Sequence, residues 1–188
     1  MKKSILVTAL AGLLIGVMPA SAAVYKVDVS HSTVGFKVKH MMISTVTGKF
    51  NTFNGTYDLD KGQFKSLSGT IKADSIDTGI AKRDDHLRSA DFFDVAKYPE
   101  ITFVMTGATK EKMTGNLSIH GITKKVTLDI DMGGTVEDPW GNIRSGFVLN
   151  GKINRKDFGL NWNKAIEAGG VVVGDEIKLV IEVEGIEE

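Results

Sequence analysis

Apolar and polar residues alternate along most of the chain after residue 23, so that every second side chain is apolar or small. A period of two is typical of strands that bury one face and expose the other. With the segments near Tyr25 and Phe50, the pattern predicts about eight or more antiparallel strands. The apolar or small positions are Val34, Phe36 and Val38; Leu67, Gly69, Ile71 and Ala73; Ile101, Phe103 and Met105; Met113, Gly115, Leu117 and Ile119; Val126, Leu128 and Ile130; Phe147, Leu149, Gly151 and Ile153; and Ile177, Leu179, Ile181 and Val183.

The segments between these strands carry glycine, mostly beside polar residues, at 60–62, 120–121, 133–134 and 138–141. Such turns favour hairpins over crossover helices. A long antiparallel meander removes its exposed edges most easily by closing on itself. We therefore expect an all-β fold, an eight-stranded antiparallel barrel. The interior of such a barrel is either filled by side chains or holds one small ligand.

The N terminus has the features of a secretory signal peptide. Lys2 and Lys3 precede an apolar run at 5–17, which is followed by Pro19 and small residues up to Ala22. This run is too short for the roughly 20 residues that span a bilayer. We expect cleavage of residues 1–22, a single lipid-binding barrel domain at 23–188, and a soluble protein exported to the periplasm.

Composition excludes several kinds of chemistry. The chain has no cysteine, which rules out disulfides, thiolate zinc sites, thiol nucleophiles and iron–sulfur clusters. Without Lys2 and Lys3, 21 basic side chains face 23 acidic ones, so nucleic acid is not an expected partner. The four histidines lack the spacing of a zinc motif. We expect no cofactor and no metal.

Three glycines occupy positions that should face the interior, namely Gly69, Gly115 and Gly151. A fully packed barrel would be expected to use bulky side chains there, so these glycines indicate internal space. Glycines in strands also mark bends and bulges that curve a sheet. Both interpretations stay open on the sequence alone.

Several segments, in their order and spacing, resemble the YceI-like polyisoprenoid-binding family. They lie at 28–32, 36–40, 47–50, 73–78, 83–94, 98–103, 115–123, 154–160 and 173–175, and together they extend over essentially the whole chain after residue 23. The resemblance implies a lipocalin-like barrel, exported, that binds an isoprenoid or fatty-chain lipid inside and has no established enzymatic activity. It leaves open a homodimer and transient contact with inner-membrane proteins.

If the barrel holds such a lipid chain, the side chains that line it are those at the inward-facing positions of the strands. The predicted lining residues are Phe36, Phe50, Ile71, Phe103, Leu117, Phe147 and Leu149. Residue by residue, an ordinary packed core is the simpler explanation of the same side chains.

The block at 83–94 combines both charge signs with two phenyl rings. Asp84 precedes Arg88 by four residues, which favours a short helix within 78–90 that acts as a lid over the barrel mouth, with Ile80, Leu87 and Ala90 toward the interior. In the functional interpretation, Arg83, His86 and Arg88 bind a phosphate or carbonyl head group, and Phe92 and Phe93 cover the first prenyl units. Alternatively, the charged residues satisfy one another and anchor a loop.

Three functions follow from these observations. A carrier for a long-chain amphiphile is the favoured one. A lipid-acting hydrolase or isomerase would use Asp85 and His86 as an acid–base pair, but it lacks a nucleophile in a recognised turn. A solid barrel that serves as a stress or scaffold protein is the third. Arg155 could either reach the mouth or pair with Asp157.

Overall fold

The computed structural model describes residues 22–166 and 169–188. The predicted signal peptide, apart from Ala22, lies outside the described residues. Within them, no helix is long and apolar enough to cross a membrane. The elements are β1 (Ala23–Val27), η1 (Val29–His31), β2 (Thr33–His40), β3 (Ser44–Phe50), β4 (Phe53–Asp60), β5 (Gln63–Lys72), η2 (Ala73–Ser75), β6 (Ile76–Asp77), α1 (Ala81–Arg88), β7 (Glu100–Ala108), β8 (Lys112–Ile119), β9 (Ile122–Glu137), β10 (Ile143–Asn154), η3 (Arg155–Phe158) and β11 (Val173–Glu187).

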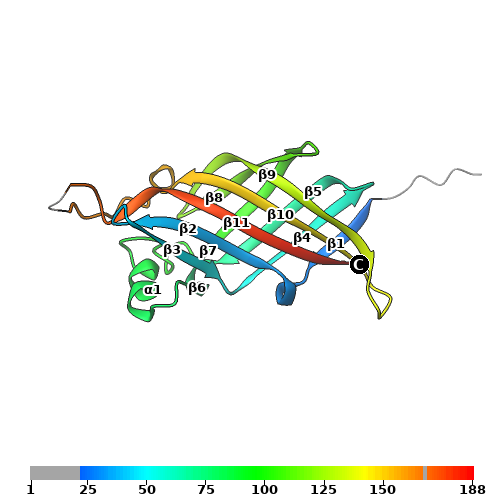
Figure 1. Cartoon of the computed structure of the whole chain (residues 1–188), viewed down its shortest axis with the longest axis horizontal. Coiled ribbons are helices and arrows are strands. Elements are labelled where there is room, and N and C mark those ends of the chain that lie inside the picture. The colour runs from blue at the N-terminus through cyan, green and yellow to red at the C-terminus, as the bar shows by residue number, and fades with distance from the viewer. Residues whose placement is uncertain (1–21, 167–168) are drawn as a thin grey trace, which may run out of the picture.

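The sheet closes because β1 pairs with two strands. Tyr25 lies opposite Tyr57 of β4 and opposite Glu187 of β11. The ring β1–β4–β5–β7–β8–β9–β10–β11 is therefore an antiparallel barrel of eight strands, with one short helix beside it (Figure 1). The predicted fold class is confirmed.

The wall differs between the two ends of the barrel. After η1 the chain continues as β2 along β11, and β3 and β6 pair outward from β2. Among the described strands, β6 ends this branch without pairing to β7. The helix α1 lies beside β3 and β6 at this end (Figure 1). Arg88 fastens the helix by donating to the backbone oxygens of Asp74 and Ile76.

Burial follows the alternation that the sequence shows. In β8, Met113, Gly115, Leu117 and Ile119 are buried while Lys112 and the other intervening residues are more exposed. The interior contains two apolar clusters, one at each end, and Phe103 contacts both.

One end of the barrel is closed by aromatic rings. Tyr25 stacks on Tyr57 with ring centroids 5.1 Å apart, and Phe147 meets both Tyr57 and Phe64 edge-on at 5.0 and 4.9 Å. The Tyr57 hydroxyl donates to the backbone oxygen of Ser145 at 2.9 Å. Burial raises the pKa of Tyr57 to about 12. We call this group the aromatic plug.

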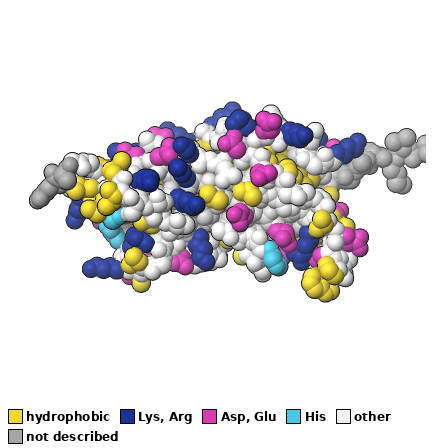
Figure 2. All heavy atoms as spheres, viewed as in Figure 1, with side chains coloured by type: hydrophobic (Ala, Val, Ile, Leu, Met, Phe, Trp, Pro, Cys, Tyr) yellow, Lys and Arg dark blue, Asp and Glu magenta, His cyan; other side chains and the backbone are white. Residues whose placement is uncertain are grey.

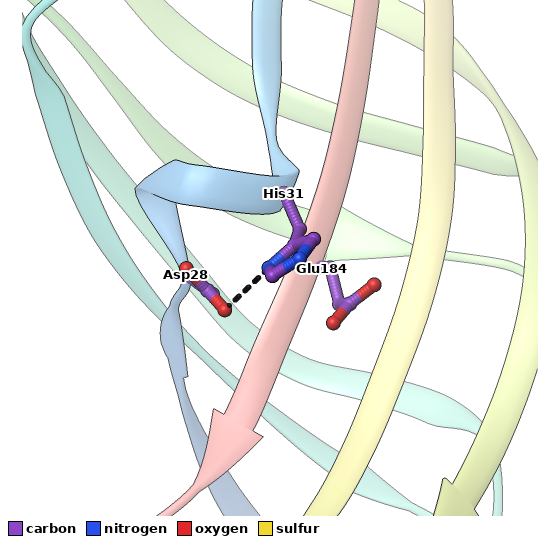
Figure 3. Close-up of side chains that lie close together, drawn as sticks. All are labelled: Asp28, His31 and Glu184. Carbon is purple, nitrogen blue, oxygen red and sulfur yellow. Dashed lines mark hydrogen bonds and ion pairs between the residues drawn. The ribbon is translucent and has the colours of Figure 1, made fainter. Parts of the chain in front are cut away.

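An ion-pair cluster lies at the same end. Arg144 Nη1 contacts Asp28 Oδ2 at 2.9 Å and Glu184 Oε1 at 2.6 Å, and its Nε contacts Asp138 Oδ2 at 2.7 Å. His31 Nδ1 lies 2.9 Å from Asp28 Oδ2 (Figure 3). Asp28, His31 and Glu184 are close enough to share a cation, but the Arg144 guanidinium already supplies the positive charge between the two carboxylates. We call this group the Arg144 cluster.

The Arg144 cluster makes the free energy of unfolding depend on pH in the acid range. The hydrogen bond from His31, with a further one from Arg144, lowers the pKa of Asp28 from 3.8 to about 2. The folded state binds this proton less readily than the unfolded chain, so the stabilisation is present above pH 3.8 and is lost as the pH falls toward 2. Asp28→Asn should cost about 1 kcal/mol at neutral pH and flatten the loss of stability between about pH 4 and pH 2, measured by urea unfolding. The control Asp129→Asn removes an exposed pair with Lys112 and should change little. Equal effects of the two substitutions would contradict this assignment.

Candidate functional site

Two apolar cavities lie inside the barrel, one behind the other. The first has a volume of about 140 Å³ and extends from the middle toward α1 and the start of β11. The second has a volume of about 100 Å³ and extends toward the aromatic plug. They share the lining residues Val34, Ile71, Leu117, Leu179 and Ile181. These residues form a waist between two compartments of one tube.

The cavities are suited to an alkyl chain. Space for one water needs only about 10–15 Å³ on this scale, yet apolar cavities of this kind stay dry and accept apolar guests. The walls of both cavities are almost wholly apolar. A polar head group would find no hydrogen-bonding partners in the second cavity and almost none in the first.

The apolar residues predicted from the sequence line these cavities. Ile71 and Leu117 line both at the waist. Phe36, Phe50, Phe92 and Phe93 line the first, and Phe103, Phe147 and Leu149 line the second. Their role in binding stays a prediction, since their position is what the structure provides.

The polar residues of the block at 83–94 do not line either cavity. Arg83 donates from Nε to Thr78 Oγ1 at 2.7 Å and from Nη2 to the Thr78 backbone oxygen at 2.8 Å. Arg88 adds an ion pair with Asp85 at 3.0 Å to its two backbone contacts. The two arginines therefore anchor the segment, as in the alternative interpretation of this block.

His86 lies on the outer side of the first cavity. Its Nε2 is 3.0 Å from Asp91 Oδ2, and its ring meets Phe92 and Trp162 edge-on with centroids 5.1 and 4.9 Å away. Asp85 pairs with Arg88 instead of His86. The structure thus does not assemble the acid–base pair that a hydrolase or isomerase at Asp85 and His86 requires.

A short helix lies within 78–90 as expected, but two of the three residues expected to face the interior, Ile80 and Ala90, are exposed. The helix spans Ala81–Arg88, and Leu87 is its one residue in the cavity lining. Ile80, expected to face the interior, is exposed because it precedes the first helical turn. Phe92 and Phe93, which follow the helix, contribute more of the wall than the helix does.

Arg155 lines the first cavity, in line with one of the two interpretations that the sequence left open for it. It is 2% exposed and donates from Nε to the Gly174 backbone oxygen at 3.0 Å and from Nη1 to that of Leu160. Its ion pair is with Asp175 at 3.2 Å, so of the two interpretations left open by the sequence, the pair with Asp157 is not the one formed. Burial lowers the pKa of Arg155, and Asp175 opposes this effect. The pairing joins η3 to β11, which no local sequence signal indicates.

The three inward glycines have different surroundings. A Cβ at Gly115 would lie 2.3 Å from the Phe103 ring, and one at Gly151 would lie 2.4 Å from Leu128. These two glycines make room for a neighbouring side chain. Gly69 lines the second cavity, and the nearest atom to its Cβ position is the Asn54 oxygen at 3.5 Å. Only Gly69 of the three therefore leaves open space.

Sequence comparison agrees with this architecture. The chain matches the YceI-like domain family over residues 25–185. It belongs to the YceI family. The YceI protein of Salmonella newport is 40% identical over 196 aligned positions, which include 100% of both chains. The YceI protein of Salmonella arizonae matches to the same extent.

Solved structures share the YceI barrel. A YceI protein of Campylobacter jejuni superposes with a TM-score of 0.70 at 35% identity, over 96% of this chain and 99% of that one. BcnA of Burkholderia cenocepacia gives 0.71 at 25% identity, over 84% and 98%. A polyisoprenoid-binding domain from Saccharophagus degradans gives 0.63 at 16% identity, over 89% and 100%, which shows a common fold.

Arg155 should be a structural residue of the first cavity. Arg155→Met keeps most of the volume but leaves two backbone carbonyl oxygens without their donor and Asp175 paired with Lys156 alone, so we expect a loss of about 3 kcal/mol in the free energy of unfolding, measured in urea. Arg83→Met, whose contacts stay within residues 78–83, is the matched control and should cost about 1 kcal/mol. A smaller loss for Arg155→Met than for Arg83→Met would contradict this role.

Proposed function

We propose that this protein is an exported, periplasmic carrier that holds a polyisoprenoid or similar long-chain amphiphile inside its barrel. The observation that carries the proposal is the tube of two adjoining cavities with almost wholly apolar walls. The Saccharophagus degradans protein of the same fold, named for polyisoprenoid binding, supports this class of ligand.

The energetics of the tube select for the tail of the ligand. Transfer of each methylene from water contributes about 0.8 kcal/mol, and the cost of ordering the chain offsets part of it. Because the walls offer almost no polar atoms, the head group is expected outside the tube. Chain length and shape, rather than head-group chemistry, should then determine affinity.

The end near α1 provides the access route. There β6 and β7 are not paired, and the wall is completed by Leu87, Phe92 and Phe93 from the helix and the turn after it. The opposite end is closed by the aromatic plug. Moving these three side chains breaks no strand pairing, whereas opening the wall elsewhere would break backbone hydrogen bonds of the sheet. The tail of a ligand would therefore enter at the α1 end.

The alternative functions have less support. Asp85 and His86 bond to different partners, and the cavity wall nearest to them is Phe92 rather than a catalytic group. A solid scaffold barrel is at odds with the two adjoining apolar cavities. We therefore propose binding without catalysis. A homodimer and transient contacts with inner-membrane proteins stay predictions.

Extraction tests the proposal directly. Protein purified without detergent should release a long-chain molecule in near-stoichiometric amount when it is denatured and extracted with organic solvent, as measured by mass spectrometry. Recovery of no such molecule from several expression hosts would count decisively against a carrier.

A cavity-filling substitution tests where the chain lies. Gly69→Leu should place its side chain in the second cavity and reduce binding of a fluorescent long-chain probe about tenfold, with little loss of stability because the cavity accepts the added atoms. Gly107→Leu is the matched control, since no atom lies within 4 Å of its Cβ position and it lines neither cavity. Equal probe binding in both variants would place the ligand elsewhere.

A further inference from the structure

The turn between β2 and β3 exposes three consecutive apolar side chains. Met41 is 40% exposed, Met42 58% and Ile43 84%. We call Met41, Met42 and Ile43 the β2–β3 tip. Figure 2 shows hydrophobic side chains gathered at this end of the molecule, beside basic ones.

The β2–β3 tip contradicts the usual chemistry of a hairpin turn. Met41 and Met42 have φ angles of 51° and 63°. Turns with positive φ favour glycine, asparagine or aspartate, because a larger side chain is strained there. Apolar residues therefore occupy this turn despite both backbone strain and exposure to water, a combination that points to a functional surface.

The β2–β3 tip lies at the α1 end of the tube, which is the proposed access end. The Met41 amide donates to the Val172 oxygen at 2.8 Å. Val38, three residues before Met41, and Val173, which pairs with His40, both line the first cavity. A surface that receives the tip would thus lie next to the access end.

Basic side chains surround the tip. Lys37 of β2 lies directly opposite Lys178 of β11, and Lys39 follows on β2. Lys164 is joined to the same region, because its oxygen accepts from the Val172 amide at 3.0 Å. None of these four lysines forms an ion pair with any residue in the described ranges.

Nearby acidic residues do not cancel this charge. Asp175 pairs with Lys156 at 2.8 Å, and Glu176 pairs with Lys152 at 3.3 Å. A neighbouring surface groove is lined by Lys37, Lys39 and Lys178 together with Met42 and with the two carboxylates paired elsewhere, Asp175 and Glu176. Apolar residues at an apex ringed by unpaired cations are complementary to the interface of an anionic bilayer.

We propose that the β2–β3 tip docks this protein on an anionic phospholipid bilayer. Met41, Met42 and Ile43 enter the interface, and Lys37, Lys39, Lys164 and Lys178 contact lipid phosphates. Docking brings the access end of the tube to the membrane. The membrane is where a long-chain ligand is found. The docking itself does not require an occupied cavity.

A second exposed apolar turn, at the opposite end of the barrel, provides a contrast within the same chain. Trp140, between β9 and β10, is 81% exposed. Its amide donates to Asp138, and this turn adjoins the Arg144 cluster, with three carboxylates around one guanidinium. That end is sealed by the aromatic plug, and its acidic side chains would be repelled by anionic lipid. Trp140 is therefore a control and not a second docking point.

The test is flotation of the purified protein with vesicles of phosphatidylcholine alone or mixed equally with phosphatidylglycerol. The wild-type protein should bind the mixed vesicles, and Met42→Ser/Ile43→Ser should bind them about tenfold less tightly. Lys37→Gln/Lys178→Gln should weaken binding several-fold and reduce its dependence on salt. Trp140→Ser should bind as the wild type does. All variants carry the same N terminus, so differences report the tip, and thermal melting checks that each is folded.

Several outcomes would overturn docking. The first is that the wild-type protein binds neither kind of vesicle. The second is that Met42→Ser/Ile43→Ser binds the mixed vesicles as tightly as the wild type. The third is that Trp140→Ser loses as much vesicle binding as Met42→Ser/Ile43→Ser. A tip that cross-links to a membrane protein while binding no vesicle also overturns it. Extraction of a long-chain molecule is measured separately, so failure of docking and failure of the proposed carrier function are distinguishable.

Discussion

Everything inside this protein depends on the closure of one antiparallel sheet. β1 completes the ring by pairing with β4 on one side and with β11 on the other. Once every strand has two neighbours, side chains must point alternately into the tube and out to water. The inward set is mostly apolar but not large enough to fill the space, which leaves two adjoining cavities. The hollow interior is thus a consequence of closure together with side-chain volume.

The two ends of the ring are built by different forces. At one end, Tyr25, Tyr57, Phe64 and Phe147 pack ring against ring, and the Arg144 cluster holds the chain outside them. At the other, side chains of α1 and the following turn cover a place where strands do not pair. This asymmetry leaves one end of the tube closed by aromatic rings and the other covered by side chains of the helix and the turn after it, and the exposed apolar tip lies at the latter.

Local pattern was a good guide to the walls and a poor guide to polar partners. Strand parity placed Phe36, Phe103, Leu117 and Leu149 in the cavity lining, because the orientation of a strand side chain is set by its position in the alternation. The partners of Arg83, Arg88 and Arg155 were not predictable in this way. Their contacts include backbone oxygens, which every residue possesses, so composition does not show which oxygen a guanidinium will reach.

The amino-acid sequence by itself determined an all-β barrel of eight strands, a short helix within residues 78–90 and an apolar lining, since period-two alternation, turn glycines and charge spacing act over a few neighbouring residues. Tertiary structure alone decided that Gly115 accommodates Phe103 while Gly69 faces open space, and that Asp175 rather than Asp157 pairs with Arg155. These outcomes depend on which strands become neighbours and in what register. Register is fixed only when the whole ring closes, because a one-residue slip would turn every apolar side chain outward.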